Sequence, residues 1–289
     1  MKLEGRRVII TGASHGFGFV VAQEFLKAGA EVVVCGRQQE TLEQAFEKCH
    51  VPTNHLHCIQ ADITKKEDMK YLVERAIQIM GGLDVVIANA GIYGPKGLLE
   101  EIDWDEWTTA IDINLKGTVL TCRAVLPHFK KQNAGKIIVL SGGGATKPMP
   151  YLSAYAASKA AVVRFVETLA QEVSPFHIEV NSVAPGALNT RLLDEVLDAG
   201  PEKVGQLFYQ QSLEQKSRGG TPLALGAALC VYLASLESDG ITGKLISAVW
   251  DPWKHFEKVK NQLKASDIYT LRRIVPEDRQ QNWSELCSE

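Results

Sequence analysis

Short, almost wholly apolar runs alternate with longer amphipathic stretches along most of this chain. The apolar runs lie at residues 7–11, 31–36, 56–61, 83–88, 136–140 and 178–183, and a seventh candidate lies at 245–249. Strands that are apolar at nearly every position are covered on both faces, as in a parallel sheet. Helices are predicted between them, for example at 17–28, 40–48, 65–80 and 104–131. The pattern therefore predicts an α/β fold with a doubly wound parallel sheet of about seven strands.

The composition fits one large domain. The chain has 289 residues, 45% of them hydrophobic, which is ample for a core. No linker or internal repeat interrupts the pattern, so we expect a single domain over 1–250 and a C-terminal extension over 251–289. The formal net charge is −3, and no apolar run reaches the ~20 residues that span a bilayer. Both observations argue against a nucleic-acid or membrane partner.

The cysteines indicate a reducing compartment. All six are widely spaced, without a Cys-x-x-Cys pair: Cys35, Cys49, Cys58, Cys122, Cys230 and Cys287. This spacing predicts free thiols and no metal site. The chain also begins almost directly with a strand and shows no signal-peptide pattern, so we expect a cytoplasmic protein.

A glycine-rich run connects the first predicted strand to the first helix. Its glycines let the backbone turn tightly and approach a pyrophosphate, while the helix N-terminus offers free N–H groups and partial positive charge. The strand–loop–helix context makes this a dinucleotide-binding loop of the Rossmann type rather than a simple tight turn. The predicted cofactor contacts in the loop are Gly12, Ser14, His15, Gly16, Phe17 and Gly18.

The ends of the third and fourth strands supply further cofactor contacts, since ligands bind at the carboxyl edge of such sheets. We expect Asp62 to accept hydrogen bonds from an adenine amino group, beside Ile63; its alternative role is a turn or helix-capping residue. The run Asn89-Ala90-Gly91 closes the fourth strand at the same edge.

The end of the second strand favours NADP(H) over NAD(H). An acidic residue there would bind a ribose 2′-hydroxyl, but this chain has Gly36 followed by Arg37. A guanidinium binds a 2′-phosphate well, and no carboxylate repels it. A protonated His15 would add to this site. NAD(H) remains possible, because a single surface arginine is often only solvated.

Tyr155 and Lys159 lie one helical turn apart in Ser153-Ala-Tyr-Ala-Ala-Ser-Lys159. An ammonium beside a phenol lowers the tyrosine pKa, so that it can exchange a proton with an alcohol or a carbonyl near neutral pH. The same spacing also occurs on ordinary solvated helix faces.

These motifs occur in an order that resembles the short-chain dehydrogenase/reductase family over residues 5–250: the glycine-rich loop, Asn89-Ala-Gly91, Asn114, Tyr155-x-x-x-Lys159 and Pro185-Gly186-x-x-x-Thr190. The resemblance implies that Tyr155 is the catalytic acid/base and that Lys159 lowers its pKa and holds the nicotinamide ribose. It implies that Asn114 holds a proton-relay water. Pro185, Gly186 and Thr190 would contact the nicotinamide carboxamide and the phosphates, and 188–220 would form a substrate lid.

The chain departs from the family pattern before Tyr155. The family places a serine thirteen residues before its tyrosine, and this chain has Gly142 there. Ser141 lies one position early, and in a regular strand it would face the opposite way. We expect the glycines to relax the strand end so that Ser141 swings in as the fourth catalytic residue. The alternative is that the hydroxyl is absent, with Ser153 a weaker substitute.

The main hypothesis is an oxidoreductase that interconverts a secondary alcohol and a carbonyl with NADP(H). Two alternatives remain: a dinucleotide-binding sensor or scaffold with little catalysis, and a dehydratase or epimerase acting on an activated sugar. The expected partners are a small-molecule substrate and further copies of the chain, as a homodimer or homotetramer. We expect the extension to pack on the domain or on a neighbouring subunit. Trp253 within it and Trp250 just before it either anchor it or stack on a ligand, and Arg272 and Arg273 would grip an anion.

Overall fold

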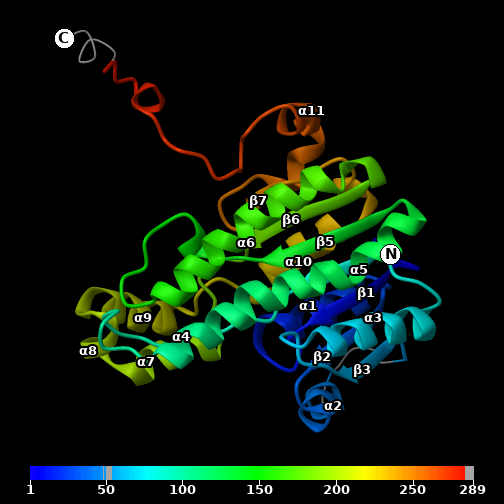
Figure 1. Ribbon diagram of the computed structural model, residues 1–289, viewed down its shortest axis with the longest axis horizontal. Helices are drawn as coiled ribbons and strands as arrows, with labels where there is room; N and C mark the ends of the chain where they lie inside the picture. The colour runs from blue at the N-terminus through cyan, green and yellow to red at the C-terminus, as the bar shows by residue number, and fades with distance from the viewer. Residues whose placement is uncertain (48, 50–53, 284–289) are drawn as a thin grey trace.

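A parallel sheet of seven strands forms the centre of the protein (Figure 1). The computed structural model describes residues 1–47, 49 and 54–283. The spatial order is β3-β2-β1-β4-β5-β6-β7, and every neighbouring pair is parallel. The strands are β1 Arg7–Thr11, β2 Glu31–Gly36, β3 Leu56–Gln60, β4 Val85–Ala88, β5 Gly135–Leu140, β6 Ile178–Ala184 and β7 Leu245–Ser247. All seven predicted strands are confirmed, and the last ends two residues earlier than predicted.

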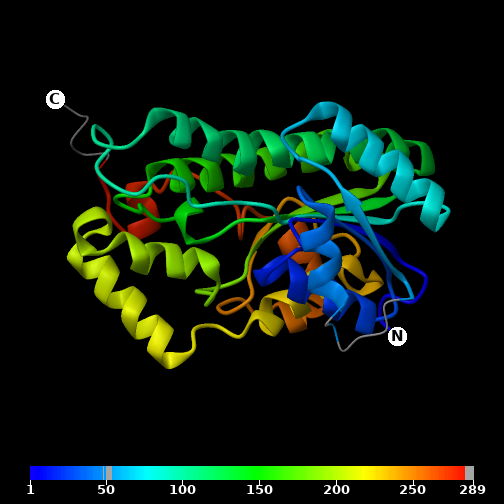
Figure 2. The same cartoon turned by 90° about the horizontal axis from the view of Figure 1, so that it is seen from below.

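Helices cover both faces of the sheet, as Figure 2 shows edge-on. The helices α1 Gly16–Lys27, α2 Gln39–Glu47 and α10 Leu223–Ala234 pack on one face. The helices α3 Lys66–Met80, α5 Thr118–Gln132 and α6 Ser153–Glu172 pack on the other. Successive strand residues point to opposite faces, so Val8 and Ile10 of β1 join the first core and Ile9 joins the second. This two-sided burial explains why the strands are apolar throughout.

The long helix predicted at 104–131 is interrupted. The structure has α4 at Trp104–Ile111, a π-helical segment at Asp112–Gly117, and then α5. The wider turn carries Asn114, whose side chain bonds the backbone of Ile92. Short π-helical turns are frequent at functional sites. The prediction of α2 included Lys48, which lies outside the described residues, as does Cys287.

The predicted lid region, residues 188–220, contains three helices near the carboxyl edge of the sheet. They are α7 Arg191–Ala199, α8 Pro201–Val204 and α9 Gln206–Arg218. They follow β6, whose carboxyl end faces the same edge as the glycine-rich loop. The order of the strands reverses between β1 and β4, and in doubly wound folds ligands bind in the crevice outside this point.

The first part of the extension packs on the domain. Trp253 is 6% exposed, its indole Nε1 donates to the Ala248 carbonyl at 3.1 Å, and its ring lies 5.7 Å from that of Tyr232. The short helices here are a 3₁₀ segment at Trp253–Lys258 and α11 at Lys260–Lys264. Farther on, the Leu245 N–H donates to the Tyr269 carbonyl at 2.8 Å. Residues 272–283 then leave the body of the protein, and we call them the C-terminal arm (Figure 1).

Candidate active site

One cavity of about 990 Å³ runs along the carboxyl edge of the sheet. Nearly every residue predicted to bind cofactor or to act in catalysis lines it. These are Gly12, Ser14, His15, Gly16, Phe17, Gly18, Arg37, Asp62, Ile63, Asn89, Ala90, Gly91, Ser141, Tyr155, Lys159, Pro185, Gly186 and Thr190. Asn114 is fully buried behind the wall of the cavity. The fold thus collects residues from most of the chain at one site.

The glycine-rich loop is tied closely to the end of β4. An added Cβ at Gly12 would lie 2.7 Å from the Ala90 Cα, and one at Gly18 would lie 2.3 Å from the Asn89 side chain. Asn89 Nδ2 donates to the carbonyls of Thr11 and Gly12 at 2.9 and 3.0 Å. Larger residues at these glycines would push the loop away from β4. The loop and the N-terminus of α1 form a backbone cradle that fits a pyrophosphate.

The end of β2, beside the glycine-rich loop, adds positive charge to the cavity. Arg37 is exposed just beyond β2, and Ser14 Oγ lies 2.9 Å from His15 Nδ1. Burial and the nearby charge of Arg191 lower the pKa of His15. His15 is therefore neutral near pH 7, and the protonated form considered from the sequence adds no charge here. The guanidinium of Arg37 is the group suited to an anion.

Asp62 forms a turn with the residues that follow it. Its Oδ1 accepts hydrogen bonds from the Thr64 N–H at 3.0 Å and from the Thr64 hydroxyl at 2.7 Å. Partial burial opposes its ionisation, but these bonds and the charges of Lys65 and Arg37 lower its pKa. The turn role and a ligand role are compatible, because Asp62 also lines the cavity.

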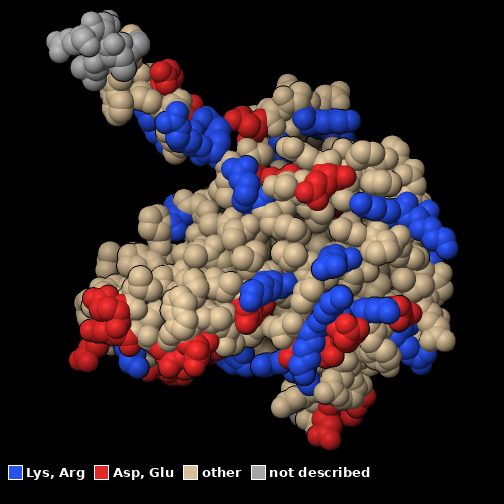
Figure 3. Space-filling view, in the orientation of Figure 1, with Lys and Arg blue, Asp and Glu red and all other residues tan. Residues whose placement is uncertain are grey.

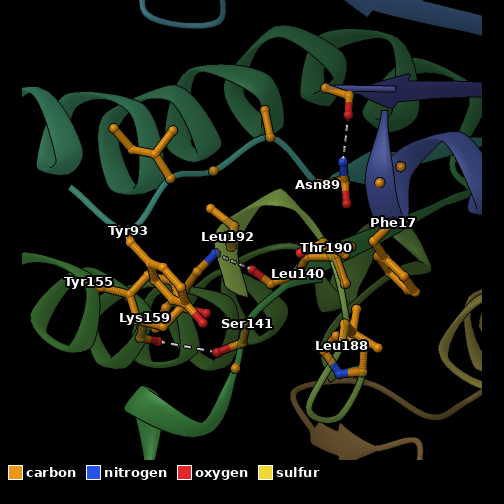
Figure 4. Close-up of a pocket in the computed structure, with 18 of the residues that line it drawn as sticks. Phe17, Asn89, Tyr93, Leu140, Ser141, Tyr155, Lys159, Leu188, Thr190 and Leu192 are labelled. Atoms are coloured by element: carbon orange, nitrogen blue, oxygen red, sulfur yellow. Dashed lines mark hydrogen bonds between the residues drawn. The ribbon is translucent and has the colours of Figure 1, made fainter. Parts of the chain in front are cut away.

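The helix α6 brings Tyr155 and Lys159 to the cavity (Figure 4). Lys159 Nζ donates to the Leu140 carbonyl at 2.8 Å and lies 5.7 Å from the centroid of the Tyr155 ring. Asn114 is anchored behind them by hydrogen bonds with both backbone groups of Ile92, each at 2.8 Å, and with Ser158 Oγ at 3.0 Å. These bonds fix the amide side chain completely.

Burial is the largest influence on the pKa values of Tyr155 and Lys159. Desolvation raises the pKa of Tyr155 above its ordinary value, and the neighbouring Tyr93 raises it further. Desolvation lowers the pKa of Lys159 to about 8. The predicted lowering of the Tyr155 pKa is therefore wrong for this structure, because the phenol is buried while the ammonium bonds to Leu140. Tyr155 is a neutral phenol near pH 7, able to donate a proton.

The predicted swing of Ser141 is not what the structure has. Its hydroxyl is buried and donates to the Lys159 carbonyl at 3.4 Å, as the dashed line in Figure 4 shows. Gly142 faces Tyr155 instead, since an added Cβ there would lie 2.6 Å from the phenolic Oη. The alternation of a regular strand thus persists through Ser141 and Gly142, two residues past the end of β5. No serine side chain occupies the family position.

Sequence reasoning missed Tyr93 as part of the site. Its ring packs edge-on against Tyr155, with centroids 4.6 Å apart and an interplanar angle of 80°. The available signal was its place two residues after Gly91. On the lid, Glu195 of α7 pairs with Lys96 at 3.4 Å, which ties the lid to the loop that carries Tyr93.

Several lid residues make the substrate end of the cavity mostly apolar. They are Leu188, Leu192, Leu193, Val196 and Phe208. Trp250, just before the extension, also lines the cavity and is 85% exposed. Arg272 is held by Asp278 and Asp267. The predicted anion grip by Arg272 therefore has no support at this cavity.

The described residues contain neither a metal-binding cluster nor a membrane-spanning helix. No group of three or more histidine, cysteine, aspartate or glutamate side chains is arranged there to hold a metal ion. No helix among them has the length and hydrophobicity needed to cross a bilayer. Five cysteines in this part of the chain are free thiols: Cys35, Cys49, Cys58, Cys122 and Cys230.

Comparison with known proteins identifies the family. The family model described as short chain dehydrogenase matches residues 6–200. Glucose 1-dehydrogenase of Gluconobacter oxydans is 35% identical, covering 85% of this chain and 91% of the relative. An uncharacterized oxidoreductase of Listeria innocua is 32% identical over 88% of this chain and 100% of its own. The structure of 3-ketoacyl-(acyl-carrier-protein) reductase from Brucella melitensis complexed with NADH superposes with a TM-score of 0.73 at 29% identity, covering 85% of this chain and 97% of that one. The chain therefore belongs to the short-chain dehydrogenase family and is an NAD(P)-dependent oxidoreductase.

Proposed function

We propose that the protein interconverts a secondary alcohol and a carbonyl, with NADP(H) as cofactor and Tyr155 as the acid/base. The observation that carries the proposal is the convergence of Tyr155 and Lys159 on one cavity, with Asn114 anchored behind them. When bound, the cofactor supplies the hydride chemistry, and the protein supplies positioning and the proton.

Tyr155 acts in the direction that its protonation favours. Its raised pKa keeps the phenol neutral, so Oη donates a proton to a carbonyl oxygen during reduction. Lys159 remains mostly charged at pH 7, since its pKa is about 8. Its ammonium would hold the nicotinamide ribose. An added Cβ at Gly91 would lie 3.1 Å from Asn114 Oδ1 and 3.4 Å from Lys159 Nζ, so both groups flank the backbone at this point.

Ser141 has a positioning role in this proposal. Its hydroxyl bonds the α6 backbone at Lys159, which helps fix the helix against the end of β5. The reacting oxygen then receives its side-chain hydrogen bond from Tyr155 without a serine partner. Pro185, Gly186 and Thr190 remain proposed contacts of the nicotinamide and phosphates.

The preference for NADP(H) rests on the end of β2. Gly36 lies beside Ser14 and supplies no carboxylate, and Arg37 is exposed and lines the cavity. A charge-assisted bond from a guanidinium to a phosphate is roughly twice as strong as a neutral hydrogen bond.

The free cysteines fit a reducing compartment, and we propose that the protein acts in the cytoplasm.

Steady-state oxidation of NADPH against a panel of ketones, aldehydes and ketoacyl thioesters tests this function. Cofactor binding is measured in parallel by fluorescence titration. Turnover of at least one carbonyl class, with tighter binding of NADPH than of NADH, is the expected result. Tight binding without turnover on any compound would favour a sensor or scaffold. Cofactor retained through purification, with no net oxidation, would favour an epimerase or dehydratase.

A further inference from the structure

The C-terminal arm, residues 272–283, is folded by its own bonds yet extends away from the domain (Figure 1). Arg272 donates to both oxygens of Asp278, at 2.7 and 2.6 Å. The Val275 N–H donates to the same carboxylate at 2.8 Å, and a 3₁₀ turn follows at Pro276–Arg279. These bonds lower the pKa of Asp278 to about 2. The arm therefore has a defined shape before it meets any partner.

The arm presents apolar and basic side chains to solvent. Ile274 is 60% exposed and Trp283 is 56% exposed. Arg273 and Arg279 are exposed and form no ion pair within the described part of the chain. The arm holds three arginines against two carboxylates, and one of these carboxylates, Asp278, is taken up by Arg272. Large apolar side chains left in water on a projecting segment mark a surface that associates.

A second exposed apolar surface lies at the start of α4, and we call residues 98–107 the α4 shoulder. Leu98 is 46% exposed, Leu99 63% and Trp104 66%, with Trp104 stacked on Trp107 at 5.1 Å between centroids. The segment has no lysine or arginine, and its five carboxylates are all exposed: Glu100, Glu101, Asp103, Asp105 and Glu106. In Figure 3 red side chains lie over the corner of the molecule where Figure 1 labels α4, α7 and α8, and blue side chains lie on the arm.

We propose that the arm of one copy of this chain docks on the α4 shoulder of a second copy. The two surfaces match in chemistry, because each has large exposed apolar groups and their free charges are opposite. The arm is pinned at its base, where the Leu271 N–H donates to Glu167 of α6 at 2.6 Å, and it points outward from there. A reciprocal exchange uses the same contact twice and closes the dimer by two-fold symmetry.

The exchange would bear on the active site. A smaller cavity of about 590 Å³ lies between the loop after β5 and the first part of the arm, and Ile274 and Arg279 are among the residues that line it. Thr146 and Lys147 of that loop line both this cavity and the main one. The part of the arm next to the smaller cavity is therefore separated from the main cavity only by this loop, so we expect docking of a second copy there to affect the active site.

Charge reversal in the full-length protein tests the exchange. Arg273→Glu with Arg279→Glu should raise the dimer dissociation constant at least tenfold, measured by sedimentation velocity. Adding Glu100→Arg and Glu101→Arg to the same chain should restore association, because both halves of the contact are then reversed. The matched control is Lys66→Glu with Lys70→Glu on exposed positions of α3, which makes the same change in net charge. Its dissociation constant should equal that of the wild type.

Hydrogen–deuterium exchange locates the contact. Amides of 98–107 and 273–283 should gain protection together as wild-type concentration rises, and should lose it in the arm variant. A wild type that stays monomeric, or an association unchanged by arm reversal, would overturn the proposal. Protection of 98–107 that depends on the arm but not on concentration would place the arm on its own shoulder, and would equally overturn it. Circular dichroism melting confirms that each variant is folded.

Discussion

Replacing Gly142 by serine supplies the residue type that the family has at this position, yet we predict that it damages the enzyme. The backbone at Gly142 is extended, with φ 177° and ψ −179°, so a side chain causes no backbone strain. The added Cβ would lie 2.6 Å from Tyr155 Oη. An unstrained contact needs about 3.5 Å, so the phenol must retreat by roughly 0.9 Å. A displacement of about 1 Å at a reacting group can cost ~10²-fold in rate.

The assay compares kcat/KM for the best carbonyl of the panel in Gly142→Ser, Gly142→Ala and the wild type. Both variants should lose activity by about 10²-fold while they bind cofactor as before. The control is Gly143→Ser, since an added Cβ at Gly143 meets no atom within 4 Å. A Gly142→Ser enzyme that equals or exceeds the wild type would refute the reasoning. It would show that Tyr155 moves freely and that the serine hydroxyl is simply missing.

Three further predictions concern the cofactor, the proton donor and the tail. Arg37→Glu should weaken NADPH binding by about 10- to 100-fold in fluorescence titration and leave NADH within a few-fold; equal losses would contradict the phosphate role. The kcat/KM for reduction should hold up to about pH 8 and fall above it, because Lys159 loses its proton there; a profile that rises through pH 9 would contradict this. Trp253→Ala should lower the free energy of unfolding in urea by about 3–5 kcal/mol, because it leaves a cavity at a buried site. An unchanged midpoint of urea unfolding would show that the extension is not part of the core.

The sequence was sufficient for the sheet and for most of the cavity. Strands buried on both faces are apolar throughout, so their positions are evident without tertiary information. Parallel strands also bring their carboxyl ends to one edge, which places Gly12, Asp62 and Asn89 at one site once the strand order is known. Local pattern and global topology agree at these positions.

The same reasoning failed where side-chain direction depends on neighbours. The orientation of Ser141 follows from the strand register, which stays regular because the next residue lies against Tyr155. The Tyr155 pKa depends on burial beneath Tyr93 and on the hydrogen bond that Lys159 makes to Leu140. The interruption at Asp112–Gly117 depends on a bond to Ile92, twenty-two residues away from Asn114. None of these contacts can be inferred from a short stretch of the sequence.

In the proposed mechanism Tyr155 donates the proton, and the cofactor is held by groups other than the Tyr155 hydroxyl. The direct measurement is single-turnover carbonyl reduction by Tyr155→Phe, with NADPH affinity measured on the same preparation. The substitution removes only the hydroxyl and keeps the phenyl ring that packs against Tyr93. We predict a loss of about 10²–10⁴-fold in the rate, with cofactor affinity within a few-fold of the wild type. A variant that keeps most of its activity would contradict the role of Tyr155 as the proton donor.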